Sequence, residues 1–255
     1  MLSELLSQLP YAFMFHELNM GRNFFTFKPS DAVQLEKQGI SLPRFQKRHR
    51  KIASAARRLA RFGLLQRYML ASFKREIVAS LSRTGVQAGV KEIRHEGWEH
   101  YLPLFPDMKV IMLGRDPRDI YISFHRMNQR GALGWRKPFN PEMVAALYNE
   151  EFARLFRMQV KTESRCIRYE DLCTDPRVLE TIKAFCRSPI PDLGQLGSFT
   201  TQYQKRKNEY EKHSGQVSSK SIERWRTEED QALVADAHRF FELVPDFVRF
   251  WGYEI

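Results

Sequence analysis

The residues with the clearest potential for binding an anion are an arginine just before a predicted helix and a serine on that helix. Arg115 follows Gly114 and Val110–Leu113, a short apolar run that is typical of a buried strand covered on both faces. Asp116 is a residue type that caps a helix, and Asp119 can complete a capping box with it. Ser123 then lies about two turns into the predicted helix.

This arrangement suits a phosphate group. Ligands of open α/β sheets bind at the carboxyl ends of the strands, and the start of a helix attracts anions. The Arg115 guanidinium can bind two phosphate oxygens, and the Ser123 hydroxyl can donate to another. A strand followed by Asp-Pro also begins many helices that bind nothing, so these residues alone leave a purely structural role open.

Two later segments, Cys166–Leu172 and Ser221–Arg226, give this pattern a context. In this order and spacing the three segments resemble the sulfotransferases that use 3′-phosphoadenylyl sulfate (PAPS), over most of the chain up to about residue 230. In that family the arginine and serine of R-D-P-R-D-x-x-x-S hold the 3′-phosphate, which implies this role for Arg115 and Ser123. The tyrosine of its Y-E-D-L segment lies beside the nucleotide, which implies that Tyr169 contacts the adenine. A core tyrosine is the alternative.

The resemblance also implies a base that takes the proton of the acceptor, and Glu17, His16 and His95 are the candidates. In the tyrosylprotein branch the base is a glutamate just after the strand that follows the first helix, and Glu17 occupies a similar place. The cytosolic branch uses the histidine of K-T-H, where this chain has Ile93. We therefore favour Glu17, for which an ion pair with Arg22 is the structural alternative.

Lys91 matches a family lysine that lies near the transferred group, so the resemblance implies that it stabilises charge on the sulfuryl oxygens. A surface lysine at a strand end is the alternative. The inferred reaction moves a sulfuryl group from PAPS, as co-substrate, to a hydroxyl or amine. The acceptor, whether a glycan, a lipid head group or a protein side chain, stays open, and we expect neither a metal nor nucleic acid to take part.

Members of the family begin with a strand and a loop such as P-K/R-S-G-T/S-T/S, and this loop binds the 5′-phosphosulfate of PAPS. The printed chain begins with Met1–Pro10, which resembles the helix after that loop, and its first glycine is Gly21. We therefore expect residues 1–255 to lack that loop and its strand, to be poorly stable and to be inactive in transfer. A truncated, non-catalytic nucleotide-binding remnant is thus an alternative to an active enzyme.

Hydrophobic periodicity predicts an α/β fold in a single domain over residues 1–255. Strands are expected at 11–15, 88–93, 109–114 and 165–168, and a long loop at 188–220. Helices are expected at 2–9, 43–81 with a break at Gly63, 97–104, 117–131, 141–160, 176–186 and from 228 onward. The resemblance implies a P-loop-NTPase-like, three-layer parallel sheet with helices on both faces, without its first strand.

Composition limits the class of protein. The net charge of +11 favours an acidic partner, and the 43% hydrophobic content is typical of a globular protein. From the residues given we expect neither a secretory signal nor a membrane span, and three cysteines without metal-type spacing predict reduced thiols in a cytoplasmic protein. The span 44–75 is rich in basic residues and lacks acidic ones. It predicts a surface for an acidic acceptor, and a nucleic-acid or membrane-surface protein is the alternative.

Overall fold

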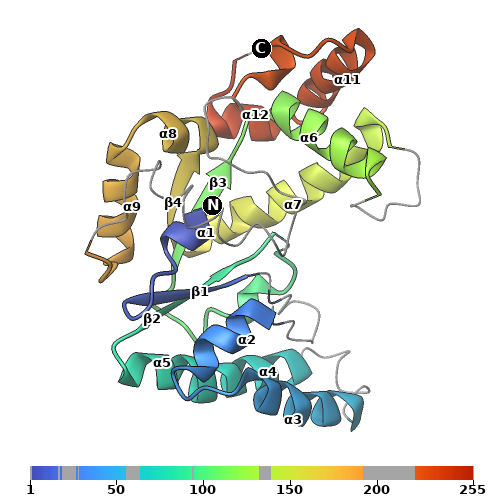
Figure 1. The fold of residues 1–255 in the computed structure, drawn as a ribbon. Coiled ribbons are helices and arrows are strands. Elements are labelled where there is room, and N and C mark those ends of the chain that lie inside the picture. Colours follow the sequence, from blue (N-terminus) through green and yellow to red (C-terminus); the bar gives the residue numbers. More distant parts are fainter. Residues whose placement is uncertain are drawn as a thin grey trace. The chain divides into compact units, whose positions relative to one another are not determined.

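The fold is described from a computed structural model that covers residues 2–16, 18, 27, 29–55, 64–93, 95–131, 139–191 and 222–254 (Figure 1). The chain forms two compact units, one of residues Met1–Lys109 and Lys183–Leu193 and the other of Val110–Ile182 and Gly194–Ile255. Each unit is described by itself. The mixed α/β class is confirmed, whereas the single domain over 1–255 stays a prediction.

Unit 1 is built from short helices around one pair of parallel strands, β1 (Ala12–His16) and β2 (Gln87–Lys91). The register pairs Ala12 with Gln87 at one end and His16 with Lys91 at the other. The remaining elements are α1 (Leu2–Leu5), α2 (Pro29–Glu36), α3 (Leu42–Ala55), α4 (Leu64–Phe73), a π-helical turn η3 (Lys74–Val78), α5 (Ala79–Arg83) and a 3₁₀ turn η4 (Trp98–His100).

The core of unit 1 packs the apolar faces of its helices onto β1. Phe13 and Phe15 are two residues apart, so their side chains lie on one face of the strand, and both are fully buried. Phe15 contacts Phe73 with a ring-centroid distance of 5.1 Å, and Phe45 contacts Phe73 at 6.4 Å. This aromatic cluster joins β1, α3 and α4, and it fixes the strand edge at which β1 and β2 end.

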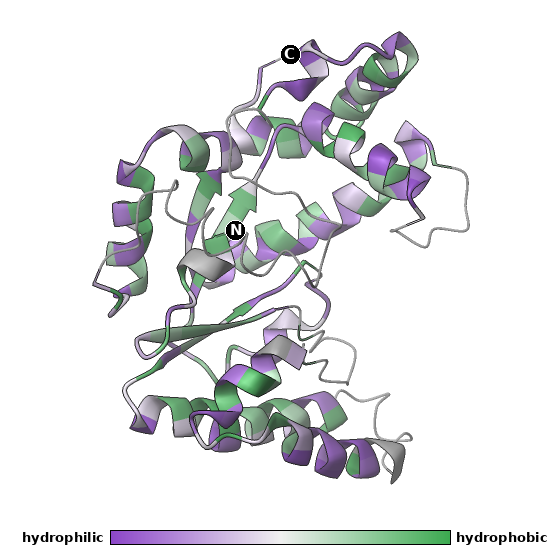
Figure 2. Cartoon of the chain, in the orientation of Figure 1, coloured by the Kyte–Doolittle hydropathy of each residue, from purple (hydrophilic) through white to green (hydrophobic). Residues whose placement is uncertain are grey.

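Unit 2 contains the strand pair β3 (Lys109–Gly114) and β4 (Glu163–Arg168) with helices that follow each strand. Figure 2 shows hydrophilic and hydrophobic residues alternating along these helices, as expected of helices with one face in a core. They are α6 (Pro117–Gln129), α7 (Pro141–Lys161), α8 (Tyr169–Thr174), α9 (Arg177–Cys186), the 3₁₀ turn η7 (Arg224–Arg226), α11 (Gln231–Glu242) and α12 (Pro245–Trp251).

The core of unit 2 is also largely aromatic. Tyr121 of α6 contacts Phe240 of α11 with a centroid distance of 5.6 Å, and Tyr148 of α7 contacts the same ring at 5.5 Å. Phe152 of α7 contacts Phe247 of α12 at 5.5 Å. Helices α6, α7, α11 and α12 therefore form one packed layer. Within it, the contact between Tyr121 and Phe240 of α11 supports the first turns of α6.

The predicted strands and most of the predicted helices agree with the structure to within a few residues, and three expectations were wrong. Helix α1 ends at Leu5 rather than at residue 9, and the helical stretch that includes residues 74–78 contains a π-helical turn. Leu113 of β3 is 45% exposed, so β3 is not covered on both faces by the residues that the structure describes. Two short helices, α2 and α8, were not predicted. Gly63 and residues 192–220 of the predicted loop lie outside the described residues.

Gly114, the last residue of β3, packs directly beneath the Trp251 ring of α12. A Cβ atom at position 114 would lie only 2.3 Å from the ring atom Cδ2 of Trp251. We therefore expect Gly114→Ala to lower the free energy of unfolding by about 1–3 kcal/mol, as overpacking of a core does. Denaturant unfolding followed by tryptophan fluorescence measures this loss.

The matched control for this prediction removes the ring. If the collision with Trp251 is the cause, Gly114→Ala should cost clearly less in a Trp251→Leu background, because the smaller side chain leaves room for the methyl group. Equal losses in the two backgrounds would show that the alanine acts through the backbone of β3 instead.

Candidate functional site

The turn from β3 into α6 is held by local contacts and by one distant carboxylate. The Asp116 side chain accepts a hydrogen bond from the backbone N–H of Arg118 at 2.8 Å, and Pro117 is the first helical residue, so the predicted cap and start are confirmed. The predicted capping box is wrong. The backbone N–H of Asp116 donates to Glu170 at 3.0 Å, because α8 brings this carboxylate to the turn, and Asp119 binds elsewhere.

Arg115 leaves β3 at this turn and lies between an acid and an aromatic ring. Its Nη2 atom is 3.6 Å from Oδ2 of Asp119, and its guanidinium lies over the Tyr169 ring at 4.8 Å from the centroid. The Arg115 side chain is 21% exposed, so part of the guanidinium reaches solvent. Ser123 is half-buried and four residues beyond Asp119, which places both on one face of α6. The structure thus brings Arg115 and Tyr169 into contact, and Ser123 lies about one turn beyond Asp119 on α6.

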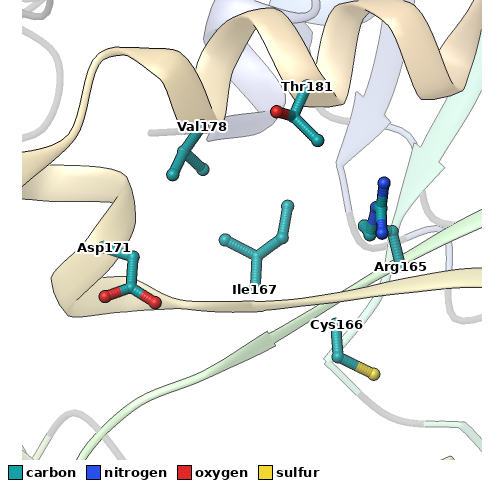
Figure 3. Close-up of a pocket in the computed structure, with 6 residues that line it drawn as sticks. All are labelled: Arg165, Cys166, Ile167, Asp171, Val178 and Thr181. Carbon is teal, nitrogen blue, oxygen red and sulfur yellow. The ribbon is translucent and has the colours of Figure 1, made fainter.

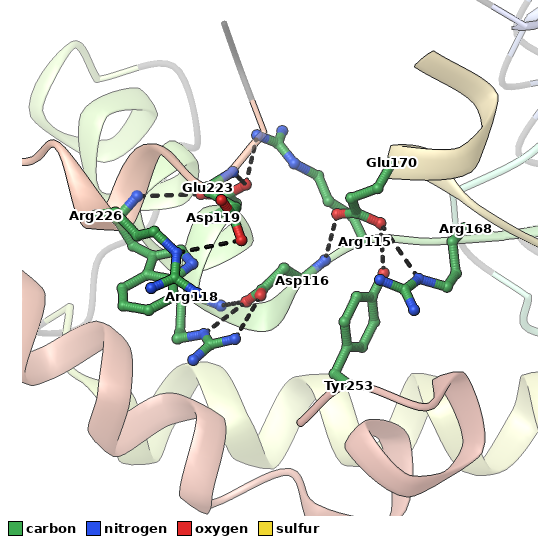
Figure 4. Close-up of polar contacts among 10 residues, drawn as sticks. Arg115, Asp116, Arg118, Asp119, Arg168, Glu170, Glu223, Arg226 and Tyr253 are labelled. Atoms are coloured by element: carbon green, nitrogen blue, oxygen red, sulfur yellow. Dashed lines mark hydrogen bonds and ion pairs between the residues drawn. The ribbon is translucent and has the colours of Figure 1, made fainter. Parts of the chain in front are cut away.

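Asp119 connects the start of α6 to a turn more than a hundred residues later in the chain (Figure 4). Its carboxylate is fully buried and accepts the backbone N–H groups of Glu223 at 2.9 Å and Trp225 at 3.3 Å. Glu223 has a left-handed backbone (φ 54°), which is unfavourable for a residue with a side chain. The Arg118 guanidinium packs on the Trp225 ring at 4.0 Å. Two residues of α6 therefore hold this strained turn in place.

Glu170, the second residue of α8, joins the carboxyl ends of both strands to the C-terminal segment. Besides the Asp116 N–H, it accepts the hydroxyl of Tyr253 at 2.8 Å, and Arg168 lies over the Tyr253 ring at 4.6 Å (Figure 4). Burial, followed by the charge of Glu170, raises the pKa of Tyr253, so its hydroxyl stays a donor. The sequence analysis did not identify Glu170 or Tyr253 as part of this site, although the acidic Y-E-D-L segment that contains Glu170 was a usable signal.

Trp225 and Arg226 belong to the 3₁₀ turn η7, which packs against the late helix α11. The Trp225 ring packs edge-on against His238 of α11, with a centroid distance of 5.0 Å, and Arg226 lies over the same ring at 4.3 Å. Arg226 also pairs with Glu223 at 3.1 Å. The turn at 222–226 therefore rests on α6 on one side and on α11 on the other.

Lys91, one of the predicted catalytic residues, lies at the edge of unit 1 where its two parallel strands end. Because His16 pairs with Lys91 in the register, the chain leaves both strands at the same edge. Glu17 is the next residue after β1 and itself lies outside the described residues. His16 is 3.9 Å from the buried Asp31, which supports a structural role for this histidine, and His95 is half-buried.

One pocket of about 250 Å³ lies in unit 2 between β4, α8 and α9 (Figure 3). The predicted site residues are not among those that line it: Arg165, Cys166, Ile167, Asp171, Val178 and Thr181. Cys166 is a free cysteine and is exposed. Within the described part of the chain, no group of three or more His, Cys, Asp or Glu side chains is placed to hold a metal ion.

The first part of the basic span 44–75 forms the outer face of α3. Leu42, Phe45 and His49 turn inward and are buried, whereas the helix exposes Arg44, Lys47, Arg48, Arg50 and Lys51. Arg48 pairs with Glu76 of η3. Because the apolar face of α3 is part of the core, this helix presents charge, not an apolar surface, to a partner.

Among the described helices, none is both long enough and apolar enough to span a membrane. A comparison with curated proteins and a comparison with solved structures each gave no match. The model of the sulfotransferase family matches residues 1–192, which include Arg115, Ser123 and Tyr169 but not the segment Ser221–Arg226. Since this match covers well over half of the chain, the protein belongs to the sulfotransferase family.

Proposed function

We propose that the protein transfers a sulfuryl group from PAPS to a hydroxyl or amine, with Arg115 and Ser123 binding the 3′-phosphate of the nucleotide. Family membership supports PAPS as the donor. The observation that carries the assignment of the phosphate site is the position of Arg115, at the carboxyl end of β3 and beside the first turn of α6. A P-loop-like sheet is part of the same proposal.

The donor groups at this position suit a phosphate. The Arg115 guanidinium is braced by the Tyr169 ring and by Asp119, so little side-chain entropy is lost when an anion binds. A guanidinium offers two parallel N–H groups to two oxygens of a phosphate, and the Ser123 hydroxyl can donate a further bond from the same helix face. The N-terminal end of α6 adds a partial positive charge. The tyrosine ring also offers an apolar surface for the nucleotide.

The transfer step requires a base for the acceptor and a cation for the sulfuryl oxygens. We assign the base to Glu17 and the cation to Lys91, with His95 as the alternative base. The shared strand edge of β1 and β2 supports this assignment, because Glu17 directly follows His16, the register partner of Lys91. Like phosphoryl transfer, the reaction depends on positioning and charge stabilisation more than on a covalent intermediate.

Arg115→Ala is expected to weaken binding of adenosine 3′,5′-bisphosphate, the product nucleotide, by about tenfold or more. Charge-assisted hydrogen bonds of this kind contribute about 1.5–3 kcal/mol each. The preference for this nucleotide over adenosine 5′-phosphate should narrow by the same factor, because the two ligands differ only in the 3′-phosphate. Titration calorimetry with both nucleotides measures the affinities.

Arg126→Ala is the matched control for this experiment. Arg126 lies on the same helix, and it pairs with Glu228 at 2.5 Å rather than with Asp119. The Arg126→Ala variant should leave the preference for adenosine 3′,5′-bisphosphate over adenosine 5′-phosphate unchanged. If Arg115→Ala binds both nucleotides as the wild type does, the 3′-phosphate is held elsewhere and the assignment of the site is wrong.

A further inference from the structure

Asp119 is placed where it interacts with the same guanidinium that we assign to the phosphate. Its Oδ2 atom is 3.6 Å from Nη2 of Arg115, and both of its oxygens also accept backbone N–H groups of the 222–226 turn. The Asp119 side chain is 0% exposed, so water does not reach it to replace a lost cation. Any charge that neutralises Arg115 therefore acts directly on this carboxylate.

The other charged groups around Asp119 are already paired with one another. On its own turn, Asp116 is bound by the Arg118 guanidinium at 2.7 Å. On the facing turn, the Glu223 side chain pairs with Arg226, and both side chains are more than half exposed. From α11, His238 packs edge-on against the Trp225 ring. Arg115 is thus the cation that the described structure places against Asp119.

The ionisation of Asp119 reflects this balance. Burial raises the pKa of Asp119 to about 6, while the charge of Arg115 and the backbone N–H groups of Trp225 and Glu223 act to lower it. Asp116 acts in the same direction as burial. If the positive charge of Arg115 is neutralised, the strongest opposing influence is lost, and the protonated form becomes favoured near neutral pH.

We propose that Asp119 is a proton-coupled positioning residue, which holds Arg115 in the free protein and takes up a proton when a phosphate binds this guanidinium. The inference rests on the proposed function for the identity of the phosphate. The proton comes from the buffer and adds to a carboxylate oxygen of Asp119, and no other bond is made or broken. Because linkage is reciprocal, a lower pH favours phosphate binding through this residue.

Calorimetric titration in two buffers of different ionisation enthalpy counts the protons taken up on binding. The probe is adenosine 3′,5′-bisphosphate at pH 7, and Asp119→Asn is the matched variant, since it keeps the size of the side chain and removes the titration. An opposite charge lowers a carboxyl pKa by about 1–3 units, so losing it should draw about half a proton or more onto Asp119 at pH 7. The wild type should exceed Asp119→Asn by this amount, and proton uptake by the phosphate itself cancels in the difference.

Adenosine 5′-phosphate provides the second arm, because it lacks the group that Arg115 is proposed to bind. With this nucleotide the wild type and Asp119→Asn should take up equal numbers of protons. If both proteins prefer the 3′-phosphate and also take up equal numbers of protons with it, the coupling is wrong and the proposed function stands. If neither protein distinguishes the two nucleotides, the proposed function fails, and the coupling fails with it.

A measurement without nucleotide tests the same coupling. Arg115→Gln imitates the neutralised guanidinium, so the pKa of Asp119, followed by carbon NMR of its carboxyl group, should rise above the wild-type value. Arg126→Gln, on the same helix, should leave the pKa of Asp119 unchanged, because its partner is Glu228. An unchanged pKa in Arg115→Gln would overturn the proposal, whatever the nucleotide titrations give.

Discussion

In an active, full-length form of the protein, Glu17→Gln is expected to lower the turnover of sulfuryl transfer by about 10²–10⁴-fold, which is the usual cost of losing a general base. Affinity for the nucleotide should stay nearly constant, because the assigned phosphate ligands, Arg115 and Ser123, belong to other elements. Glutamine keeps the shape of the side chain and removes its ability to accept a proton at neutral pH. Transfer from radiolabelled PAPS to glycan, lipid and protein fractions first identifies an acceptor, and turnover is then measured with that acceptor.

Glu17 directly follows His16, the register partner of Lys91, and this makes the prediction specific. His16 is close to Asp31 and is half-buried, so the preceding residue is not free to serve as a base in its place. Glu36→Gln, which changes an exposed carboxylate on α2, is the matched control and should retain full turnover. Near-normal turnover in Glu17→Gln, together with a collapse in His95→Ala, would assign the base to His95.

The start of α6 could be predicted from sequence because its signals are local. An apolar run, a capping aspartate and a proline at the first helical position act within a few residues, and the structure shows all three as expected. The same is true of α7, where Asn140 caps a helix that begins at Pro141. The four predicted strands also agree with the structure to within a few residues.

The partners of these residues could not be predicted, because they come from distant parts of the chain. Asp119 was expected to bond back to Asp116, three residues away. It binds Glu223 and Trp225 instead, at separations of 104 and 106 residues. No periodicity or capping rule contains that information. The exposure of Leu113 is a similar case, since covering a strand depends on which elements pack over it, not on the strand's own apolar residues.

The unpredicted contacts of Asp119 have a large expected effect on stability. Asp119→Ala removes the acceptor of two backbone N–H groups in the 222–226 turn and the partner of the Arg115 guanidinium. Each buried N–H left without an acceptor costs about 1–3 kcal/mol, so the free energy of unfolding should fall by about 2–6 kcal/mol. That is a large fraction of the roughly 5–15 kcal/mol that stabilises an ordinary domain.

The pH dependence separates this mechanism from a general loss of packing. In the folded protein the pKa of Asp119 is about 6, above its ordinary value of 3.8, so the folded state binds the proton more tightly than the unfolded state does. The stability that Asp119 contributes is therefore fully present below pH 3.8 and is lost as the pH rises through 6. The difference in the free energy of unfolding between wild type and Asp119→Ala should then be about 1 kcal/mol larger at pH 5 than at pH 8.

Denaturant unfolding at both pH values measures this gap in the free energy of unfolding. Hydrogen exchange at the backbone N–H groups of Glu223 and Trp225 should accelerate in the variant. A gap of the same size at pH 5 and pH 8, with these two amides still protected, would mean that the turn is held by Arg118 and the Trp225 ring rather than by the carboxylate.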